Sequence, residues 1–275
     1  EVLQQAIDMA LPRFPTYKVA MRRGVFWRYL EPNHRPGPFV QADIGNPCKP
    51  MYYKENNRYL LRFYYYHNRV SMEAHHSLGD GSGGMTVFLT VVATYLNLLG
   101  HDIKPEGMVL DINAKPDPGE LEDSYMKYAN AKVCPPRPAE KTYRIKGTKE
   151  PFYTLNIIDG IMSTPEVIKV AKSYNATITE YLNAVLLYAL MQKQQNSWHL
   201  SLKPIRIAMP VNLRKIFPSK TVRNFITMIY PGIDPRLGEY TFEEIVKHVH
   251  NYMQYYVNEK LLRGDITTNA ATTRN

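Results

Sequence analysis

The sequence predicts a mixed α/β fold built in two halves. The chain has 275 residues, of which 44% are hydrophobic and 12% aromatic. This is a globular composition, and a usual domain size of about 150 residues gives about two domains or subdomains. Segments with strand-like alternation and segments with helical periodicity are interspersed along the chain. This mixture favours α+β or mixed α/β layers over a strict βαβ winding.

A long proline-rich stretch separates the two halves. Residues 101–150 hold six prolines, many charges and no sustained periodicity, which predicts a crossover linker with one short helix near residues 121–131. We therefore place the N-terminal half, including this linker, at residues 1–150 and the C-terminal half at 151–275. The polar segment at residues 263–275 is predicted to be a loop.

The N-terminal half shows helix, hairpin and helix patterns in that order. A helix is expected at residues 2–11, a strand-like stretch broken at Gly24 over 18–30, and a loop over 32–50. Aromatic and alternating residues predict two strands, 60–66 and 69–75, with a turn at residues 67–68. An apolar run predicts a buried helix over 81–99, with Ser82 as its N-cap and Gly100 as its end.

The C-terminal half begins with a predicted strand at residues 152–158. Three capping boxes then mark helix starts, because a Ser or Thr is followed three residues later by Glu. They begin at Ser163, Thr177 and Thr241, and the last helix is expected to run to about residue 262. Further strands are predicted at 205–213 and 224–230.

The charge is strongly basic and unevenly distributed. The net charge is +9, which suits nucleic acid, an anionic membrane, acidic partner proteins or phosphorylated cofactors, or only a solvated face. No nucleic-acid motif occurs, so a nucleic-acid partner is not expected. Residues 201–223 carry six basic residues and no acidic one: Lys203, Arg206, Arg214, Lys215, Lys220 and Arg223.

The apolar and cysteine patterns favour a cytoplasmic protein. The longest apolar run, residues 85–99, is shorter than the roughly 20 residues that a membrane-spanning helix needs. No basic and then apolar leader is found at the start of the chain. Cys48 and Cys134 match no zinc or redox motif, so we expect reduced thiols, with one disulfide as the alternative.

The segment HHSLGDG, from His75 to Gly81, is the strongest chemical signal in the sequence. If the two histidines continue the preceding strand, their side chains point to opposite faces and cannot easily bind one metal ion together. No metal site is therefore predicted. His76, nearer the glycine-rich loop, is assigned the active role, and His75 a structural or positioning role.

Asp80 lies four residues after His76 and is flanked by glycines. These glycines disfavour a helix at this point and allow backbone N–H groups to approach a ligand. Asp80 either orients the imidazole, as in a catalytic triad, or turns away and pairs with an arginine to fix the loop. The positive N-terminus of the following helix favours a neutral histidine, which suits a general base.

The segment HHSLGDG resembles the HHxxxDG motif of the chloramphenicol-acetyltransferase-like superfamily, which includes condensation domains of peptide synthetases and several acyltransferases. Two stretches, EAHHSLGDGSGGM and PVNLRKIFPSKTVRNFI, are similar to bacterial alcohol-acetyltransferase-like proteins. The resemblance extends from the first helix to Leu262. The motif is specific to the superfamily and does not specify the substrate.

The resemblance implies a pseudo-dimer of two-layer α/β sandwich halves with the site in a tunnel between them. His76 would be the general base, and Gly81 would bring its backbone to the reacting centre. Asp80 would be structural, and Arg214 is its candidate partner, with a surface arginine as the alternative. Asn224 would hydrogen-bond near the tunnel, or only start a strand. The superfamily's second half continues with further strands, so here it is expected to be incomplete.

The resemblance also implies an activity. The leading hypothesis is an acyltransferase that moves an acetyl or longer acyl group from acyl-CoA to a small alcohol or amine acceptor, directly and without an acyl-enzyme. Acyl-CoA is then a co-substrate and no permanently bound cofactor is expected. The alternatives are a condensation-type catalyst that uses groups bound to an acyl carrier protein, and a non-catalytic binding module.

Overall fold

The computed structural model describes residues 1–45, 47–130, 141–152, 154–196 and 202–272. These residues form a mixed α/β structure with small sheets, which confirms the predicted fold class. They divide into two compact units, each made of several segments, and the division into halves at residue 150 stays a prediction. The first unit comprises Glu1–Lys127, Glu150–Leu155 and Pro218–Phe225, and the second Tyr128–Lys149, Asn156–Phe217 and Ile226–Asn275.

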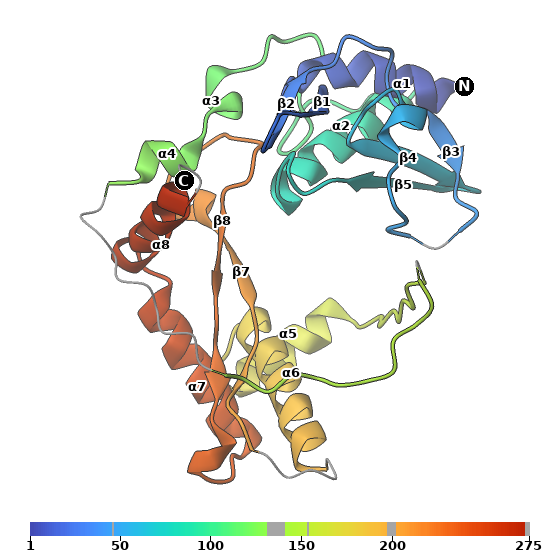
Figure 1. Ribbon diagram of the computed structural model, residues 1–275. Helices are drawn as coiled ribbons and strands as arrows, with labels where there is room; N and C mark the ends of the chain where they lie inside the picture. Colours follow the sequence, from blue (N-terminus) through green and yellow to red (C-terminus); the bar gives the residue numbers. More distant parts are fainter. Residues whose placement is uncertain (46, 131–140, 153, 197–201, 273–275) are drawn as a thin grey trace. The chain divides into compact units, whose positions relative to one another are not determined.

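The first unit contains two helices packed together and a three-stranded sheet (Figure 1). Strand β4 lies in the middle, antiparallel to β5 and parallel to β3. The predicted helices and the hairpin are confirmed, whereas β3 lies in the stretch that was predicted to be a loop. The elements are α1 (Val2–Ala10), β3 (Val40–Ala42), β4 (Leu61–Tyr66), β5 (Arg69–Ala74) and α2 (Gly81–Leu98).

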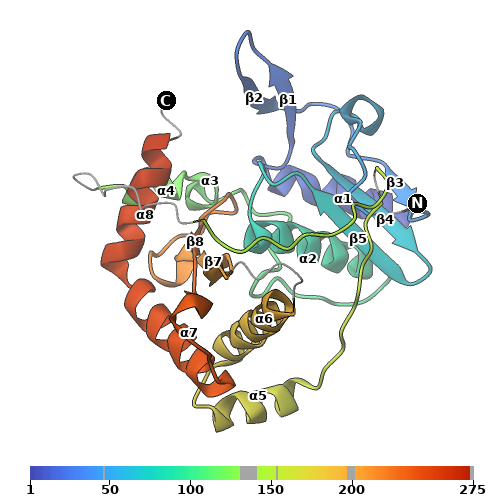
Figure 2. The same ribbon diagram turned by 60° about the horizontal axis from the view of Figure 1, so that its bottom comes forward.

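A second hairpin projects from this unit (Figure 2). Strands β1 (Val19–Arg23) and β2 (Arg28–Pro32) pair antiparallel. The stretch that was predicted to be a broken strand is therefore a hairpin, and the break at Gly24 is its turn. The N–H of Gly24 donates to the carbonyl oxygen of Trp27 at 2.7 Å, which closes the turn.

The core of the first unit lies between the helices and one face of the sheet. Strand alternation sends Leu61 and Phe63 into this core, where both are fully buried, while Arg62 and Tyr64 lie on the opposite face. Val222, from far along the chain, belongs to the same core. The segment that carries Val222 is therefore part of the first unit's packing. The buried hydrophobic residues include Leu3, Ile7, Leu11, Phe14, Tyr17, Tyr59, Leu60, Leu78, Val87 and Val91.

Helix α2 is the one described helix that is long and apolar enough, by length and composition, to cross a membrane. Core helices pass the same test, and one third of this helix is buried in the protein. It packs against α1 and buries Val87 and Val91. The predicted burial holds for this face only, since Met85 is 46% exposed.

Where the structure describes the linker region, up to residue 130 and from 141, it has two short helices, α3 (Pro118–Leu121) and α4 (Ser124–Tyr128), in place of the single helix predicted there. Asp117 caps α3, since its side chain accepts from the N–H of Gly119. Short 3₁₀ turns occur at Leu11–Arg13, Tyr53–Asn56, Leu213–Lys215 and Pro235–Leu237. Cys134 lies outside the described residues, and Cys48 is an exposed free thiol.

The second unit consists mainly of helices. Its core lies where α6 and α7 pack together, with Leu187, Ile245 and Val249 fully buried. Two short antiparallel strand pairs accompany the helices, β6 with β9 and β7 with β8. The elements are α5 (Thr164–Ser173), α6 (Ile178–Gln195), β6 (Ile205–Arg206), β7 (Met209–Asn212), β8 (Ile226–Ile229), β9 (Gly232–Ile233), α7 (Phe242–Tyr256) and α8 (Glu259–Thr272).

The predicted boundaries of this unit hold in part. The capping boxes at Thr177 and Thr241 form, whereas Ser163 caps α5 without a side-chain hydrogen bond. The strand predicted at 152–158 is absent from the described residues of that stretch, which exclude 153. The tail that was predicted to be a loop is helical as far as residue 272, where the described residues end, because Leu262 and Ile266 lie on one helix face and are fully buried.

One buried ion pair ties the N-terminal region to the linker. Arg13 is 7% exposed, and its guanidinium donates to both carboxylate oxygens of Glu120 at 2.5 and 2.8 Å. This interaction raises the pKa of Arg13. We expect Glu120→Gln to lower the free energy of unfolding by about 3 kcal/mol, because it leaves a buried cation without its counter-charge. Urea denaturation measures the change.

The matched control is the exposed pair of Arg22 and Glu31, whose side chains are 40% and 34% exposed. Glu31→Gln should cost at most about 1 kcal/mol, because water screens an exposed pair. Equal losses in the two variants would contradict the structural importance of the buried pair.

Candidate active site

The HHxxxDG segment begins where strand β5 ends. The N–H of His75 still donates to the carbonyl oxygen of Leu60 at 2.8 Å, and the N–H of Leu78 then donates to the carbonyl oxygen of His75 at 3.0 Å. This second hydrogen bond closes a turn that contains His76, which is exposed. Strand β5 ends at Ala74, one residue before the predicted end, so the condition that both histidines continue the strand is not met.

The two histidine rings have different surroundings. Nδ1 of His75 lies 2.8 Å from Oγ of Ser77 and accepts the N–H of Ser77 at 3.3 Å. Because a backbone N–H can only donate, a neutral His75 ring carries its proton on Nε2. Among the described residues, no group hydrogen-bonds the ring of His76. The turn therefore fixes the His75 ring, whereas the His76 ring is exposed.

Asp80 is the buried brace of the loop. Its side chain accepts the N–H of Gly83 at 3.0 Å and, through its other oxygen, the N–H of Phe225 at 2.8 Å. Asp80, and not Ser82, is thus the N-cap of α2. The prediction that the glycines prevent a helix here is also wrong, because this cap and the bond from Gly84 N–H to the Asp80 carbonyl start the helix.

The segment 221–225 is the second wall of the site. The side-chain amide of Asn224 donates to the carbonyl oxygen of His76 at 2.8 Å. The hydroxyl of Tyr17 donates to the carbonyl oxygen of Val222 at 3.2 Å. The structure therefore brings Asn224, a predicted site residue, against the backbone of the predicted base. Its role in substrate binding stays a prediction.

The glycines of the motif do two different things. A Cβ on Gly83 would lie 1.9 Å from the carbonyl oxygen of Val222, and one on Gly79 would lie 2.6 Å from the same atom. These two glycines are therefore needed for contact with segment 221–225. Gly81 has nothing within 4 Å of its Cβ position. It is the motif glycine that leaves open space, and its predicted role at the reacting centre stays a prediction.

Linker residues hold segment 221–225 in place. The N–H of Val222 donates to the carbonyl oxygen of Glu120 at 3.0 Å, and Oγ1 of Thr221 donates to that of Glu122 at 2.8 Å. Lys220 pairs with Asp117 at 2.8 Å and lowers the pKa of that carboxyl, aided by the Gly119 N–H.

The predicted basic run is divided between the two units. Lys220 and Arg223 lie in the first unit, and each contacts a linker carboxylate, Asp117 or Asp123. Arg214 lies in the second unit, in a 3₁₀ turn that Asn212 caps. Its guanidinium donates to Oδ1 of Asn212 at 3.3 Å. The pairing of Arg214 with Asp80 stays a prediction.

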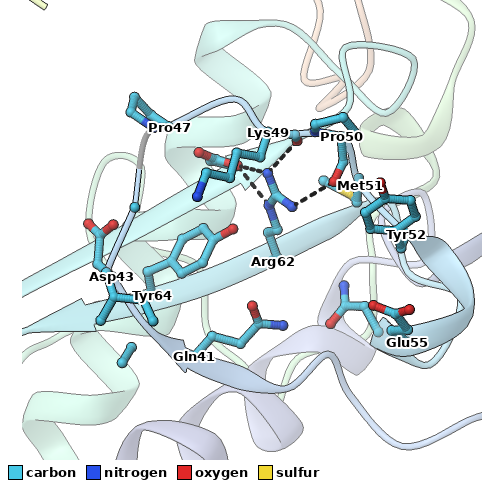
Figure 3. A pocket seen from close by; sticks show the side chains of 15 residues that line it. Gln41, Asp43, Pro47, Lys49, Pro50, Met51, Tyr52, Glu55, Arg62 and Tyr64 are labelled. Carbon is cyan, nitrogen blue, oxygen red and sulfur yellow. Dashed lines mark hydrogen bonds and ion pairs between the residues drawn. The ribbon is translucent and has the colours of Figure 1, made fainter. Parts of the chain in front are cut away.

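A separate pocket of about 640 Å³ lies on the outer face of the sheet (Figure 3). Arg62 spans its wall, donating to Glu73 at 2.7 Å and to the carbonyl oxygen of Lys49 at 2.7 Å. The guanidinium thus fastens the loop before β4 to the sheet. None of the predicted site residues lines this pocket.

No metal centre is found in the part of the chain that the structure describes. No group of three or more His, Cys, Asp or Glu side chains there has an arrangement that could hold a metal ion. The groups that the structure does place at the motif are the His76 imidazole, backbone N–H groups and the start of helix α2.

Comparison with solved structures identifies the fold. No family model and no curated protein matches the sequence. Polyketide synthase associated protein 5 from Mycobacterium tuberculosis matches with a TM-score of 0.57 and 14% identity, over 97% of this chain and 67% of that one. TRI101 of F. sporotrichioides, complexed with coenzyme A and T-2, matches with a TM-score of 0.55 and 11% identity, over 97% and 67%.

Domains of peptide synthetases match as well. The epimerization domain from the third module of tyrocidine synthetase B has a TM-score of 0.55 and 11% identity, over 97% of this chain and 66% of that one. The chain thus shares its fold with these acyltransferase and peptide-synthetase structures. It spans about two thirds of the length of these proteins.

Sequence patterns indicated no role for Tyr17 or Val222, and they indicated Phe225 only as part of a motif-like stretch. The Tyr17 hydroxyl and the backbone groups of Val222 and Phe225 make contacts that no motif letter records. The glycines carried a usable signal, since closely spaced glycines indicate a close backbone approach. The glycine pattern predicts the approach of a ligand, whereas at Gly79 and Gly83 the closely approaching atoms belong to the chain itself.

Two glycine substitutions test this assembly. Gly83→Ala should lower the free energy of unfolding by about 1–3 kcal/mol, because its Cβ would overlap the carbonyl oxygen of Val222. Gly81→Ala is the matched control in the same helical turn, where the added Cβ meets open space. It should be neutral or stabilising by up to about 1 kcal/mol. Chemical denaturation of both variants measures the difference, and equal stabilities would contradict the predicted contact.

Proposed function

We propose that the protein is an acyltransferase that moves an acetyl or longer acyl group from acyl-CoA to an alcohol or amine acceptor. The observation that carries this proposal is the state of His76. Its backbone is held by Asn224 and its turn is closed by Leu78, while its ring is exposed and has no hydrogen-bond partner among the described residues. The fold supports an acyltransferase-like function, and one protein with this fold was crystallised with coenzyme A.

In this proposal, His76 acts as a general base. A ring nitrogen takes the proton from the acceptor's hydroxyl or amine while the acceptor's oxygen or nitrogen forms a bond to the thioester carbonyl carbon. The carbon–sulfur bond then breaks, and the departing thiolate takes the proton back from the imidazolium. No acyl-enzyme forms, and atoms and charge balance without a further reactant.

The surrounding groups have positioning roles in this proposal. Asp80 holds the start of α2, so the partial positive charge of the helix N-terminus stays beside the turn. Gly81 is the first residue of α2 and has open space beside it. A developing negative charge on the thioester oxygen would be stabilised at such a position. His75, whose ring Ser77 fixes, supports the turn.

A second candidate is a condensation-type catalyst that takes its acyl group from a carrier protein. Two observations favour it. Condensation and epimerization domains share the fold, with TM-scores of 0.51 and 0.55. The net charge of +9 also suits an acidic protein partner. The chemistry at His76 would be the same, and only the thioester's carrier would differ.

Removal of the base tests the proposal. With acetyl-CoA and a panel of alcohols and amines, His76→Ala should lower acceptor-dependent thiol release by about 100- to 10,000-fold, because proton transfer by a positioned base contributes this much. His101→Ala, which removes another exposed histidine, is the control and should be unchanged. Thermal unfolding verifies that both variants are folded.

The donor decides between the two candidates. Transfer from free acyl-CoA supports the CoA-dependent enzyme, and transfer from carrier-bound acyl groups alone supports the condensation-type catalyst. If His76→Ala releases thiol at the wild-type rate, both candidates are refuted. If the wild-type protein transfers an acyl group from neither donor, a non-catalytic binding module is favoured.

A further inference from the structure

The tip of the β1–β2 hairpin carries a contiguous group of exposed apolar side chains. Val25 is 78% exposed, Phe26 91% and Trp27 63%. Tyr29 and Leu30 on strand β2 are 47% and 40% exposed. Single exposed apolar residues are ordinary, but a contiguous group at the end of a projecting hairpin marks an interaction surface.

The same hairpin is basic. Residues 18–30 contain four basic residues and no acidic one. Arg23 and Arg28 are cross-strand partners next to the tip, a placement in which like charges repel. Among the described residues, neither contacts a carboxylate. The nearest acidic residue, Glu31, pairs with Arg22. The tip thus presents two uncompensated cations beside a group of apolar side chains.

We propose that this hairpin docks the protein on an anionic lipid bilayer. Val25, Phe26 and Trp27 would enter the interfacial region, where amphipathic indole rings are favoured and apolar side chains lose contact with water. Arg23 and Arg28 would then contact lipid phosphates and carboxylates, which removes their mutual repulsion. This inference is independent of the proposed acyl transfer, because none of these residues belongs to the candidate active site.

The combination of an apolar tip and two flanking arginines favours an anionic membrane over an acidic protein as the partner. A protein partner would have to supply an apolar pocket for a tip in which Phe26 is almost fully exposed, together with acidic groups on both sides. A bilayer with anionic lipids offers both features along its whole surface. The hairpin is also a small protruding element, which suits shallow insertion. Binding of the tip to a second copy of this chain is a different outcome, and the experiment below distinguishes it from membrane binding.

The experiment is vesicle co-sedimentation of the protein. Phosphatidylcholine vesicles with phosphatidylserine should bind it, and vesicles of phosphatidylcholine alone should bind it much less. Phe26→Ser should weaken binding about tenfold or more, since it removes a large apolar group. The double variant Arg23→Gln/Arg28→Gln should weaken it about 25-fold, at about fivefold per arginine. High salt should act in the same direction.

Two matched controls accompany these variants. Phe152→Ser removes a phenylalanine that is also 91% exposed, and Lys146→Gln/Lys149→Gln removes two exposed cations elsewhere. Neither should alter binding. The chain has two tryptophans, so a Trp198→Phe background leaves Trp27 as the single indole. Its fluorescence should shift to the blue with anionic vesicles and be quenched by brominated lipid.

Three results would overturn the proposal. The first is no binding to anionic vesicles by the folded protein. The second is binding that the tip variants and the controls alter equally. The third is self-association in the absence of lipid that Phe26→Ser abolishes, as measured by sedimentation velocity, which would assign the tip to a second copy of the chain.

Discussion

The carboxylate of Asp80 is the interaction on which the first unit's candidate site depends. One oxygen accepts the N–H of Gly83 and caps α2, and the other accepts the N–H of Phe225, which lies 145 residues further along the chain. Hydrogen bonds to a charged group contribute about 1.5–3 kcal/mol each. Because Asp80 is only 3% exposed, loss of either donor would also leave a buried charge less well compensated.

This brace works only because two backbones approach each other closely. The carbonyl oxygen of Val222 occupies the space where Gly79 and Gly83 would carry a Cβ. The same carbonyl oxygen also accepts a hydrogen bond from the hydroxyl of Tyr17, so a buried aromatic residue fixes its position. The loop, the segment 221–225 and the N-terminal core are therefore one packed assembly. The glycines of the motif are a steric requirement of that assembly as much as of any chemistry.

Sequence patterns predicted those helices and turns that are stabilised by interactions between residues close together in the chain. The hairpin around residues 67–68, the helix after the motif and the capping boxes at Thr177 and Thr241 all rest on neighbours within a few residues. Strand β3 was not predicted, because it consists of three residues without a recognisable strand pattern and is formed by pairing with β4. Helix α8 was not predicted because its buried stripe is sparse among polar residues. The resemblance implied that Asp80 braces the loop through an arginine, and that pairing stays a prediction. The two backbone N–H groups that Asp80 accepts, from Gly83 and Phe225, are contacts that sequence letters do not show.

The position of His76 follows from these constraints. Its backbone carbonyl accepts the amide of Asn224, whose neighbour Phe225 donates to Asp80 four residues further along the motif. The turn is therefore fixed at two points by one short segment, and the imidazole needs no hydrogen bond of its own to be held in place. In the proposed mechanism, a base that is positioned through its main chain keeps both ring nitrogens for proton transfer. The buried carboxylate and the closely packed glycines would then hold the residue, and the imidazole alone would react.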